Sequence, residues 1–332
     1  MTGGDPMADT ATATRGLTIR PARADDVTAC AAIWRISIND YTSRLGQAEI
    51  PMELGPITRL YAHLQASDGE RFLVAEMPGE PGEPGEPGEI VAFTAATLRD
   101  RQWYLSMLFV LPDFQGSGLG RELLERILPS DDGIARAVAT DSAQPISNAL
   151  YARYGMVPRI PLLSLTGLPL RPEAFGELPS GVVPLAFEEI AAGPPEGQGH
   201  RLLTEAVDAL DAELVGSTHP IDHRFLRTES RHGWLYRGPD GVPLGYGYAG
   251  EAGRVGPVAV RDAALLGPVL GHLTSAVQAR GAFAMWVPGS AGQAVVTALA
   301  AGFRLDPFPV LLCWDRPLAD FSRYLPISPG LI

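Results

Sequence analysis

The sequence predicts an α/β protein that is built from two domains of similar architecture. With 332 residues the chain is long for one domain, since domains average roughly 150 residues. Strand-like and helix-like segments alternate along it, and the second half repeats the element order of the first. Hydrophobic residues make up 46% of the chain, which is enough for two full cores. We therefore expect domains at 17–168 and 185–332, joined by a Pro/Gly-punctuated linker at 169–184.

The chain starts with a segment that lacks the marks of a targeting signal. Residues 1–16 contain neither a basic stretch nor an apolar run, which predicts a disordered leader. No later run reaches the roughly 18 apolar residues that span a bilayer. The two cysteines, Cys30 and Cys313, fit neither a disulfide framework nor a metal site and are typical of free thiols in a reducing cytosol. We therefore expect a cytoplasmic protein without membrane contact.

Apolar periodicity predicts the elements of the first hundred residues. They are a strand at Leu17 to Arg20, a helix carrying Val27 to Trp34, a helix at 56–65, and paired strands at 71–77 and 90–98. Between the paired strands, Pro-Gly-Glu is repeated four times over residues 78–89. This composition predicts an extended, solvated, acidic hairpin loop.

The most informative stretch joins a strand to a helix through a glycine-rich loop. Trp103 to Val110 is rich in aromatic and branched residues, as a strand should be, and Pro112 ends it. After the loop, apolar residues recur at spacings of three and four and give the helix one apolar face. These residues are Leu119, Leu123, Leu124 and Ile127. The loop itself reads Gln-Gly-Ser-Gly-Leu-Gly over residues 115–120.

Three glycines at alternate positions of the loop suit the approach of a bulky anion. Without Cβ atoms the backbone can come close to a ligand, and the first N–H groups of the following helix have no intrahelical acceptor. Such donors suit a phosphate or pyrophosphate. A Walker-type loop is excluded because no Lys follows Gly120. A dinucleotide fingerprint is weakened because the GxGxxG spacing is not met, although Asp141 ends the next strand.

The same residues resemble motif A of the GNAT superfamily of acyl-CoA-dependent N-acyltransferases. That motif is a strand ending in L-[YF]-V-x-P, followed by [QR]-G-x-G-[IL]-G and a helix. The chain matches it with Leu108-Phe109-Val110-Leu111-Pro112 and then with residues 115–120. The strand, the loop and the helix therefore all agree with the family pattern.

A second match to the same superfamily follows in the expected order. Residues 135–140 predict a strand, and 144–156 predict a helix that is similar to motif B, N-x-x-A-x-x-L-Y-E-K-x-G-F. Tyr151 falls on the tyrosine position and Gly155-Met156 on the Gly-Phe position, whereas Gln144 stands where asparagine is usual. Two ordered motifs are more specific than either motif alone.

The resemblance implies a fold, a cosubstrate and a set of site residues. Each domain would be a mixed, mostly antiparallel sheet with a splayed central strand pair, flanked by helices. Acetyl-CoA would be the cosubstrate, with its pantetheine arm paired to the backbone at Leu108 and Val110. Tyr151 would protonate the departing thiolate, and no metal would take part. The pyrophosphate would be held by residues Gln115, Gly116, Ser117, Gly118, Leu119, Gly120 and Arg121.

The general base stays open at this point. Many relatives carry a glutamate two residues before the leucine of L-[YF]-V, where this chain has Ser106. An amine must be neutral to attack a thioester, so a base or a water chain has to remove a proton. The alternatives are Asp40, Glu53 or another carboxylate that is reached through solvent, and none of them is singled out. Asp40 and Glu53 lie in the segment 37–54, which the resemblance places as a loop at one wall of the acceptor cleft.

The second half looks like a second, degenerate GNAT domain. Val258-Ala259-Val260 is similar to Leu108-Phe109-Val110, and Ala301-Gly302-Phe303 is similar to Tyr154-Gly155-Met156. The phosphate loop has no counterpart, because residues 264–269 carry bulky side chains. We expect 157–165 to form the last strand pair of the first domain and 303–314 to close the second sheet.

Charge and metal-ligand spacing limit the functions of the chain. The net charge of −12 and the pI near 5.0 argue against a nucleic-acid surface, which needs clustered basic residues. His219, His223 and His232 lack the spacing of a metal motif, so we expect a surface or capping role for them. A second copy of the chain is a further candidate partner, through the second domain.

We expect an N-acetyltransferase that transfers an acetyl group from acetyl-CoA to a primary amine of a small molecule or protein. The acceptor would attack directly in a ternary complex. The alternative is an acyl-CoA-binding sensor or interaction module with little turnover. A dinucleotide-binding oxidoreductase is a more distant alternative.

Overall fold

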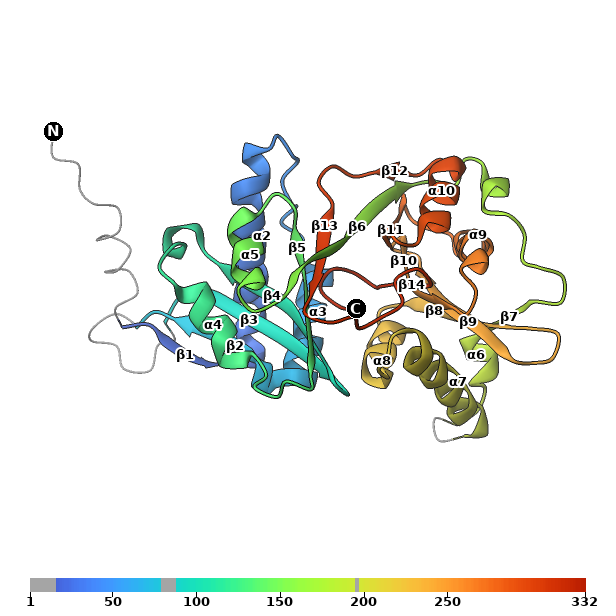
Figure 1. Ribbon diagram of the computed structural model, residues 1–332, viewed down its shortest axis with the longest axis horizontal. Coiled ribbons are helices and arrows are strands. Elements are labelled where there is room, and N and C mark those ends of the chain that lie inside the picture. The colour runs from blue at the N-terminus through green and yellow to red at the C-terminus, as the bar shows by residue number, and fades with distance from the viewer. Residues whose placement is uncertain (1–15, 79–87, 195–196) are drawn as a thin grey trace. The chain divides into compact units, whose positions relative to one another are not determined.

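The computed structural model describes residues 16–78, 88–194 and 197–332 (Figure 1). The expected leader lies outside these ranges except for Gly16, and so does most of the expected Pro-Gly-Glu loop. The elements that carry the candidate site all lie within the described residues.

The chain divides into two compact units, which are described separately. Unit 1 comprises the residues up to 98 together with 105–132. Unit 2 comprises 99–104 together with 133–332. The domain limits that the sequence predicts, with a linker at 169–184, stay a prediction.

In the described part of unit 1, four strands form a sheet with helices packed on it. Strands β1 with β2 and β2 with β3 are antiparallel, and β4 is the neighbour of β3. The strands are β1 (Thr18–Pro21), β2 (Phe72–Glu76), β3 (Ile90–Arg99) and β4 (Gln102–Val110). The helices are α2 (Val27–Arg44), α3 (Gly55–Asp68) and α4 (Leu119–Ile127).

Aromatic and leucine side chains hold these helices to the sheet of unit 1. Tyr61 of α3 is fully buried, with its ring centroid 6.3 Å from Phe72 and 5.2 Å from Phe93. Phe93 in turn stacks on Phe109 at 5.7 Å. The predicted apolar face of α4 is confirmed, because all four of its periodic side chains are buried. The side chains of β4 are therefore packed as far as Phe109, near the end of the strand.

Helix α2 is longer than the sequence pattern indicates. The expectation of a loop over 37–54 is wrong at its start, since the helix continues to Arg44. No proline or glycine interrupts the chain before Gly46, which has a φ of +70°. An ion pair at a spacing of four joins Asp40 to Arg44 at 2.8 Å and supports the last turn.

Unit 2 contains one continuous sheet of mixed direction. Its neighbours follow the order β5, β13, β6, β11, β10, β9, β8, β7, and only β10 and β11 are parallel among these pairs. The strands are β5 (Ala135–Asp141), β6 (Val157–Gly167), β7 (Val183–Ala186), β8 (Arg231–Arg237), β9 (Pro243–Gly250), β10 (Arg254–Val260), β11 (Phe283–Pro288) and β13 (Val310–Trp314). Two further strands, β12 (Arg304–Leu305) and β14 (Tyr324–Leu325), pair with β6 and β10.

The helices of unit 2 enclose its main core. Residues from α9, α10 and the strands β10 and β11 form one buried apolar cluster. Phe175, within the segment expected as a linker, is 2% exposed and belongs to this cluster. The helices are α5 (Pro145–Ala152), α6 (Phe187–Ile190), α7 (Gln198–Leu214), α8 (Pro220–Thr228), α9 (Leu266–Ala276) and α10 (Gly292–Ala301).

The strand near the C-terminus does not pair as the sequence suggests. β13 lies between β5 and β6, with Val310 opposite Asp141 on one side and Leu162 on the other. Residues 157–165 belong to the single strand β6 rather than to a strand pair. Alternating apolar residues identify a strand but not its neighbour, because the pairing groups are backbone N–H and C=O.

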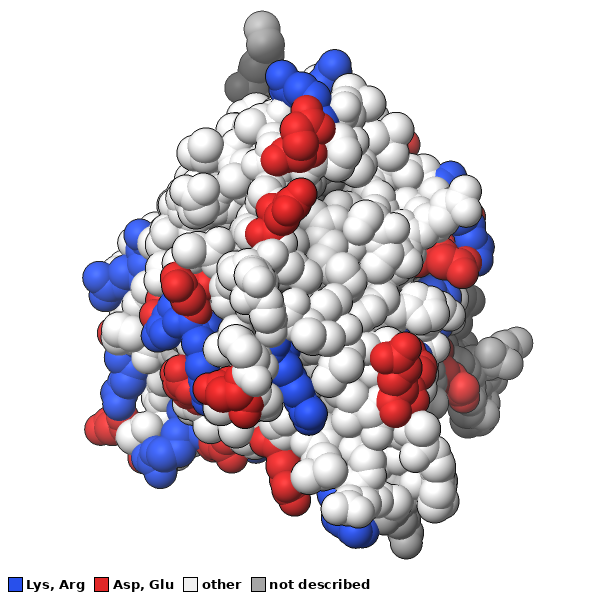
Figure 2. Space-filling model, turned by 90° about the vertical axis from the view of Figure 1, so that its right-hand side faces the viewer, with Lys and Arg blue, Asp and Glu red and all other residues white. Residues whose placement is uncertain are grey.

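The charged residues are mixed over the surface. In the face that Figure 2 shows, Arg side chains stand beside Asp and Glu, and wide uncharged areas lie between them. Within the described ranges, no helix has both the length and the apolar composition that a bilayer span requires.

Candidate acyl-CoA site

The predicted phosphate loop of unit 1 has the backbone that its glycines permit. After β4 and a short 3-10 turn at 112–114, Gly116 has a φ of +78° and Gly118 a φ of +91°. Both angles lie in the left-handed region that other residues rarely adopt. Gly118 is the N-cap of α4, and nothing lies within 4 Å of a Cβ placed on Gly116. The loop is therefore open on the side where Gly116 has no side chain.

The N-terminus of α4 presents backbone donors that have no acceptor within the helix, although the Leu119 N–H makes a long hydrogen bond of 3.4 Å to the Ser117 hydroxyl. The first bond inside this helix runs from the Glu122 N–H to the Gly118 carbonyl at 3.0 Å. N–H groups earlier in the first turn have no intrahelical acceptor, and the helix dipole adds partial positive charge. Gly116, Gly118 and Arg121 are exposed. This end of α4 can therefore receive an anion from solvent.

The strand end that leads into the loop is already hydrogen-bonded. The Val110 carbonyl accepts from the side-chain amide of Gln115 at 2.9 Å and from the Ser37 hydroxyl at 3.1 Å. Leu108 and Val110 are half-buried. No sequence pattern points to the contact of Ser37 with Val110, because the two residues are more than seventy positions apart in the chain.

Ser106 has a buried hydroxyl without a protein partner. The residue is 8% exposed, and its Oγ has no hydrogen-bond partner among the described residues. Side chains of a strand alternate between its faces, so Ser106 shares a face with Leu108 and Val110. Buried polar groups in native proteins are nearly always paired, with protein, water or ligand. The hydroxyl therefore marks a place that a polar ligand or water can occupy.

The carboxylates considered as bases lie on or after α2. Asp40 is paired with Arg44, and Glu49 lies 3.6 Å from the Arg35 guanidinium. Glu53 is exposed in the turn before α3. None of these contacts selects one carboxylate as the base.

Tyr151 lies in unit 2, on α5, so its surroundings are described apart from the loop. The residue is 5% exposed, and burial raises the pKa of its hydroxyl well above 10, an effect to which Cys313 adds. A hydrogen bond with Ser147 acts in the opposite direction on this pKa but is outweighed. Tyr151 is therefore protonated at neutral pH and can donate a proton.

The second half has no counterpart of the phosphate loop. Ahead of α9, the Asp262 carboxylate accepts the Ala264 N–H at 2.9 Å, which uses one of the donors there. Gly267 lacks a left-handed φ, and a Cβ on it would lie 2.8 Å from the Phe175 carbonyl oxygen. Phe175 thus covers the start of α9, where an anion would have to enter.

Two of the three histidines are buried, which corrects the expectation of a surface role. His223 Nε2 lies 2.9 Å and His219 Nδ1 3.3 Å from the carboxylate of Asp211, which is 0% exposed. The Tyr246 hydroxyl donates to the same carboxylate at 2.6 Å. His232 is about half exposed. No group of His, Cys, Asp and Glu among the described residues has the arrangement of a metal site.

The end of β4, the glycine loop and the N-terminus of α4 together form a site that can receive an anion. Residues 33–156 match the model of the Acetyltransferase (GNAT) family. The matched residues contain both stretches that resemble the superfamily motifs, at 108–120 and at 144–156. The predicted fold, a mixed and mostly antiparallel sheet flanked by helices, is confirmed.

Solved structures resemble the chain over almost its whole length. A Pyrococcus horikoshii protein assigned as an acetyltransferase has a TM-score of 0.70 at 14% identity, covering 96% of both chains. A GCN5-related N-acetyltransferase from Sphaerobacter thermophilus has a TM-score of 0.57 at 19% identity, covering 92% of this chain and 98% of the other. A tandem GNAT protein from the clavulanic acid biosynthesis pathway has a TM-score of 0.52 at 17% identity, covering 91% and 99%. No functionally curated protein shows significant sequence similarity to the chain.

Similarity at these identities shows the fold and not the substrate. The match to the GNAT family model supports acyl transfer in general, and proteins of that family typically bind CoA-based substrates.

Proposed function

We propose that the protein is an N-acetyltransferase that transfers an acetyl group from acetyl-CoA to a primary amine of a small molecule or protein. The acceptor attacks directly in a ternary complex. The observation that carries the proposal is the loop before α4, where Gly116 and Gly118 adopt left-handed backbone and leave helix donors exposed.

Residues 115–121 are proposed to bind the pyrophosphate through backbone N–H groups. The α4 dipole favours negative charge at this end, and Arg121 adds a full positive charge. The fit rests on the open space at Gly116, which a side chain would otherwise fill. Leu108 and Val110 are proposed to pair with the pantetheine arm through their backbone, and the bound cosubstrate supplies a thioester-activated acetyl group.

The hydroxyl of Ser106, which has no hydrogen-bond partner among the described residues, is proposed to bind a water molecule or the acceptor amine. Alkyl amines resemble Lys, with a pKa near 10.4, so most are protonated at neutral pH and must lose a proton before attack. Ser106 cannot take that proton itself, but a water held by it can pass the proton on. Asp40 and Glu53 stay the candidate bases. A backbone N–H near Leu108 is proposed to stabilise charge on the acetyl oxygen.

Tyr151 is proposed as the acid that protonates the leaving thiolate. Its raised pKa keeps the hydroxyl protonated under all neutral conditions. An ordinary thiol has a pKa of about 8.5, which is below that of Tyr151, so transfer of the tyrosine proton to the thiolate is completed when solvent reprotonates the tyrosinate. The proposal gives Tyr151 a role in the release of CoA and none in its binding.

One observation favours a binding module with little turnover as the second candidate. Ser106 stands where a base is common among relatives, and Asp40 is already paired with Arg44. Such a module would bind acetyl-CoA as well as the enzyme would. The two candidates therefore differ only in amine-dependent release of CoA.

The test combines binding and turnover on the full chain. Binding stabilises by RT ln(1 + [L]/Kd), or about 2.7 kcal/mol at a hundredfold excess over Kd, so acetyl-CoA should raise Tm clearly and NAD should not. Gly118→Glu should abolish the rise, because it adds charge and strain at the N-cap. Gly281→Glu is the matched control, since nothing lies within 4 Å of a Cβ there and the residue is exposed.

Turnover is measured as CoA release over a panel of amines. All 26 basic residues of the chain are arginine, so the protein offers no lysine amine of its own as an acceptor. Release that depends on an added amine and on Tyr151 supports the enzyme. If acetyl-CoA raises Tm but no amine causes release of CoA, the binding module is supported. If acetyl-CoA does not raise Tm, the proposed function is wrong.

A further inference from the structure

The central strands of the second GNAT-like fold separate after a short contact. β10 and β11 are paired in parallel only at Arg254 with Ala284 and Val255 with Met285. The order of elements around them repeats the first half, with a 3-10 turn and a helix following β10 as they follow β4. Beyond Val255, the edge of β10 that faces β11 is free to pair with something else.

A segment of the same chain pairs with β10 where β11 leaves it. β14 is antiparallel to β10, with Leu325 opposite Val258 and Tyr324 opposite Ala259. The Val260 N–H extends the pairing by donating to the Arg323 carbonyl at 3.0 Å. β14 also contacts β11. It therefore lies in the opening between the two strands.

The position of β14 corresponds to a ligand-binding position proposed for the first half of the chain. Val258-Ala259-Val260 is the counterpart of Leu108-Phe109-Val110, the strand end proposed to pair with pantetheine. In the second fold, a peptide backbone makes that pairing instead. A strand added to an open sheet edge gains main-chain hydrogen bonds, while its side chains fill pockets.

The side chains of β14 are buried, and the residues that precede the strand are hydrogen-bonded to neighbouring elements. Tyr324 and Leu325 are each 2% exposed, and Ile327 is 8% exposed. Before the strand, the Asp320 N–H donates to the Leu214 carbonyl at 2.8 Å, and the Ser290 hydroxyl donates to the Phe321 carbonyl at 2.8 Å. The segment 318–332, named here the C-terminal segment, is thus bound along both strands and α7.

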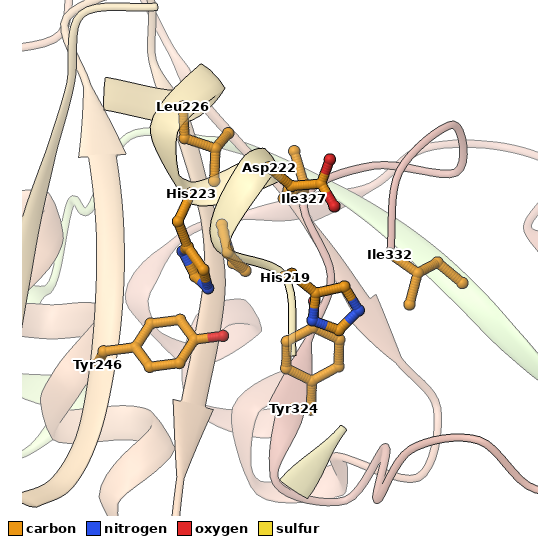
Figure 3. A pocket seen from close by; sticks show the side chains of 9 residues that line it. His219, Asp222, His223, Leu226, Tyr246, Tyr324, Ile327 and Ile332 are labelled. Atoms are coloured by element: carbon orange, nitrogen blue, oxygen red, sulfur yellow. The ribbon is translucent and has the colours of Figure 1, made fainter. Parts of the chain in front are cut away.

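Little space is left between the C-terminal segment and the residues of α8 and β9 that it faces. Figure 3 shows the remaining pocket, with Tyr324, Ile327 and Ile332 of the C-terminal segment facing His219, His223 and Tyr246. Its volume is about 10 Å³, which is room for one water molecule and no more.

We propose that the cleft of the second GNAT-like fold is a peptide-binding site and that its ligand is the C-terminal segment. The ligand class is an extended strand that carries an aromatic and an aliphatic side chain, here Tyr324 and Leu325. The peptide takes the place that the cosubstrate has in the first fold. The chain consequently binds one acetyl-CoA and not two, a corollary that rests on the proposed function.

The proposal is tested by cutting, with a protease, the loop that precedes the C-terminal segment in the folded chain. Arg316 and Pro317 are exposed, so a protease site inserted between them can be cleaved without removing any residue. The fragment 317–332 should stay bound through gel filtration and exchange slowly with a labelled synthetic peptide of the same sequence. A peptide carrying Leu325→Asp should compete at least a hundredfold less well. Loss of the fragment with an unchanged Tm overturns the proposal.

A second measurement covers the case in which the insertion prevents folding. In the uncut chain, Leu325→Asp should lower Tm by several degrees more than Leu299→Asp, whose side chain is 37% exposed. Equal shifts overturn the proposal. Calorimetry with acetyl-CoA should give one site per chain, and two sites also overturn it. If acetyl-CoA does not bind at all, the proposed function fails while the peptide results still decide this inference.

Discussion

The side-chain amide of Gln115 donates a hydrogen bond of 2.9 Å to the backbone carbonyl of Val110. The Ser37 hydroxyl donates to the same oxygen, so both lone pairs of this carbonyl are in use. Val110 is one of the two residues proposed to pair with the pantetheine arm. Pairing of the pantetheine arm with this oxygen requires that the hydrogen bond from Gln115 or the one from Ser37 is broken. Gln115 is the more exposed of the two residues.

We predict that Gln115→Ala binds acetyl-CoA two- to tenfold more tightly. A neutral hydrogen bond contributes about 0.5–1.5 kcal/mol, and the variant no longer has to break one. Calorimetric titration of acetyl-CoA measures the change. Gln47→Ala is the matched control, since its amide also donates to a backbone carbonyl, that of Leu45. Unchanged or weaker affinity in Gln115→Ala would show that the Val110 carbonyl takes no part in binding.

Two glycines of the loop should respond differently to alanine. Gly118 has a φ of +91°, so Gly118→Ala should cost about 1–2 kcal/mol of stability and weaken acetyl-CoA binding. Gly120 lies inside α4 without a left-handed φ, and its added Cβ would make an ordinary contact with Val110 at 3.6 Å. Gly120→Ala should therefore leave stability unchanged within error. Urea unfolding of both variants measures their free energies of unfolding. Equal losses of stability would contradict the argument that the left-handed backbone at Gly118 requires glycine.

Tyr151→Phe should lower kcat roughly 10²-fold or more, as expected when an acid is removed. The Kd of acetyl-CoA should change less than twofold, because the ring stays in its buried place. Burial raises the pKa of Tyr151 above 10, so its ionisation should cause no loss of activity as pH rises from neutral toward 10. Steady-state rates over pH 6–10 measure both effects. A Tyr151→Phe variant with normal turnover would remove this residue from the mechanism.

The buried carboxylate of Asp211 should be a large contributor to the stability of unit 2. It accepts hydrogen bonds from His219, His223 and Tyr246, all of which would face an amide in Asp211→Asn. Breaking a buried charged network of this kind costs roughly 3–5 kcal/mol. Denaturant unfolding at pH 7 measures the loss. A cost below that of an ordinary surface substitution would contradict the network.

Asp208 offers a matched control on the same helix. Burial, with a further effect from Asp211, raises its pKa, and one of its carboxylate oxygens has no partner among the described residues. Asp208→Asn removes this unfavourable charge and should leave stability unchanged or increased at pH 7. The two substitutions change the same group in the same way, so opposite outcomes isolate the hydrogen bonds of Asp211.

The pH dependence of stability follows from the same carboxylate. Burial alone raises the pKa of Asp211, but the hydrogen bonds from His219 and His223 outweigh it and hold the pKa well below the usual 3.8. A lowered folded-state pKa gives stability that is complete above about pH 4 and is lost as the pH falls below that value. The wild-type protein should therefore lose stability between pH 4 and 2 more steeply than Asp211→Asn.

Local patterns were sufficient to predict the glycine loop of unit 1 and the helix that follows it. The spacing of Gly116, Gly118 and Gly120 predicted an open loop, and the spacing of the leucines predicted the buried face of α4. The same reasoning ended α2 too early, because the polar residues between Ser37 and Arg44 were taken for a loop. Propensity is a weak guide where a polar helix face is simply turned to solvent.

The sequence by itself determined the resemblance to the GNAT family, the position of the glycine loop and the absence of a similar loop sequence in the second half. These features depend on residues within one turn or one strand, whose backbone preferences act locally. Only the tertiary structure decided that β13 lies between β5 and β6, that β14 pairs with β10, and that two histidines contact Asp211. These partners are set by backbone pairing and packing across long separations, which leave no periodic signal along the chain.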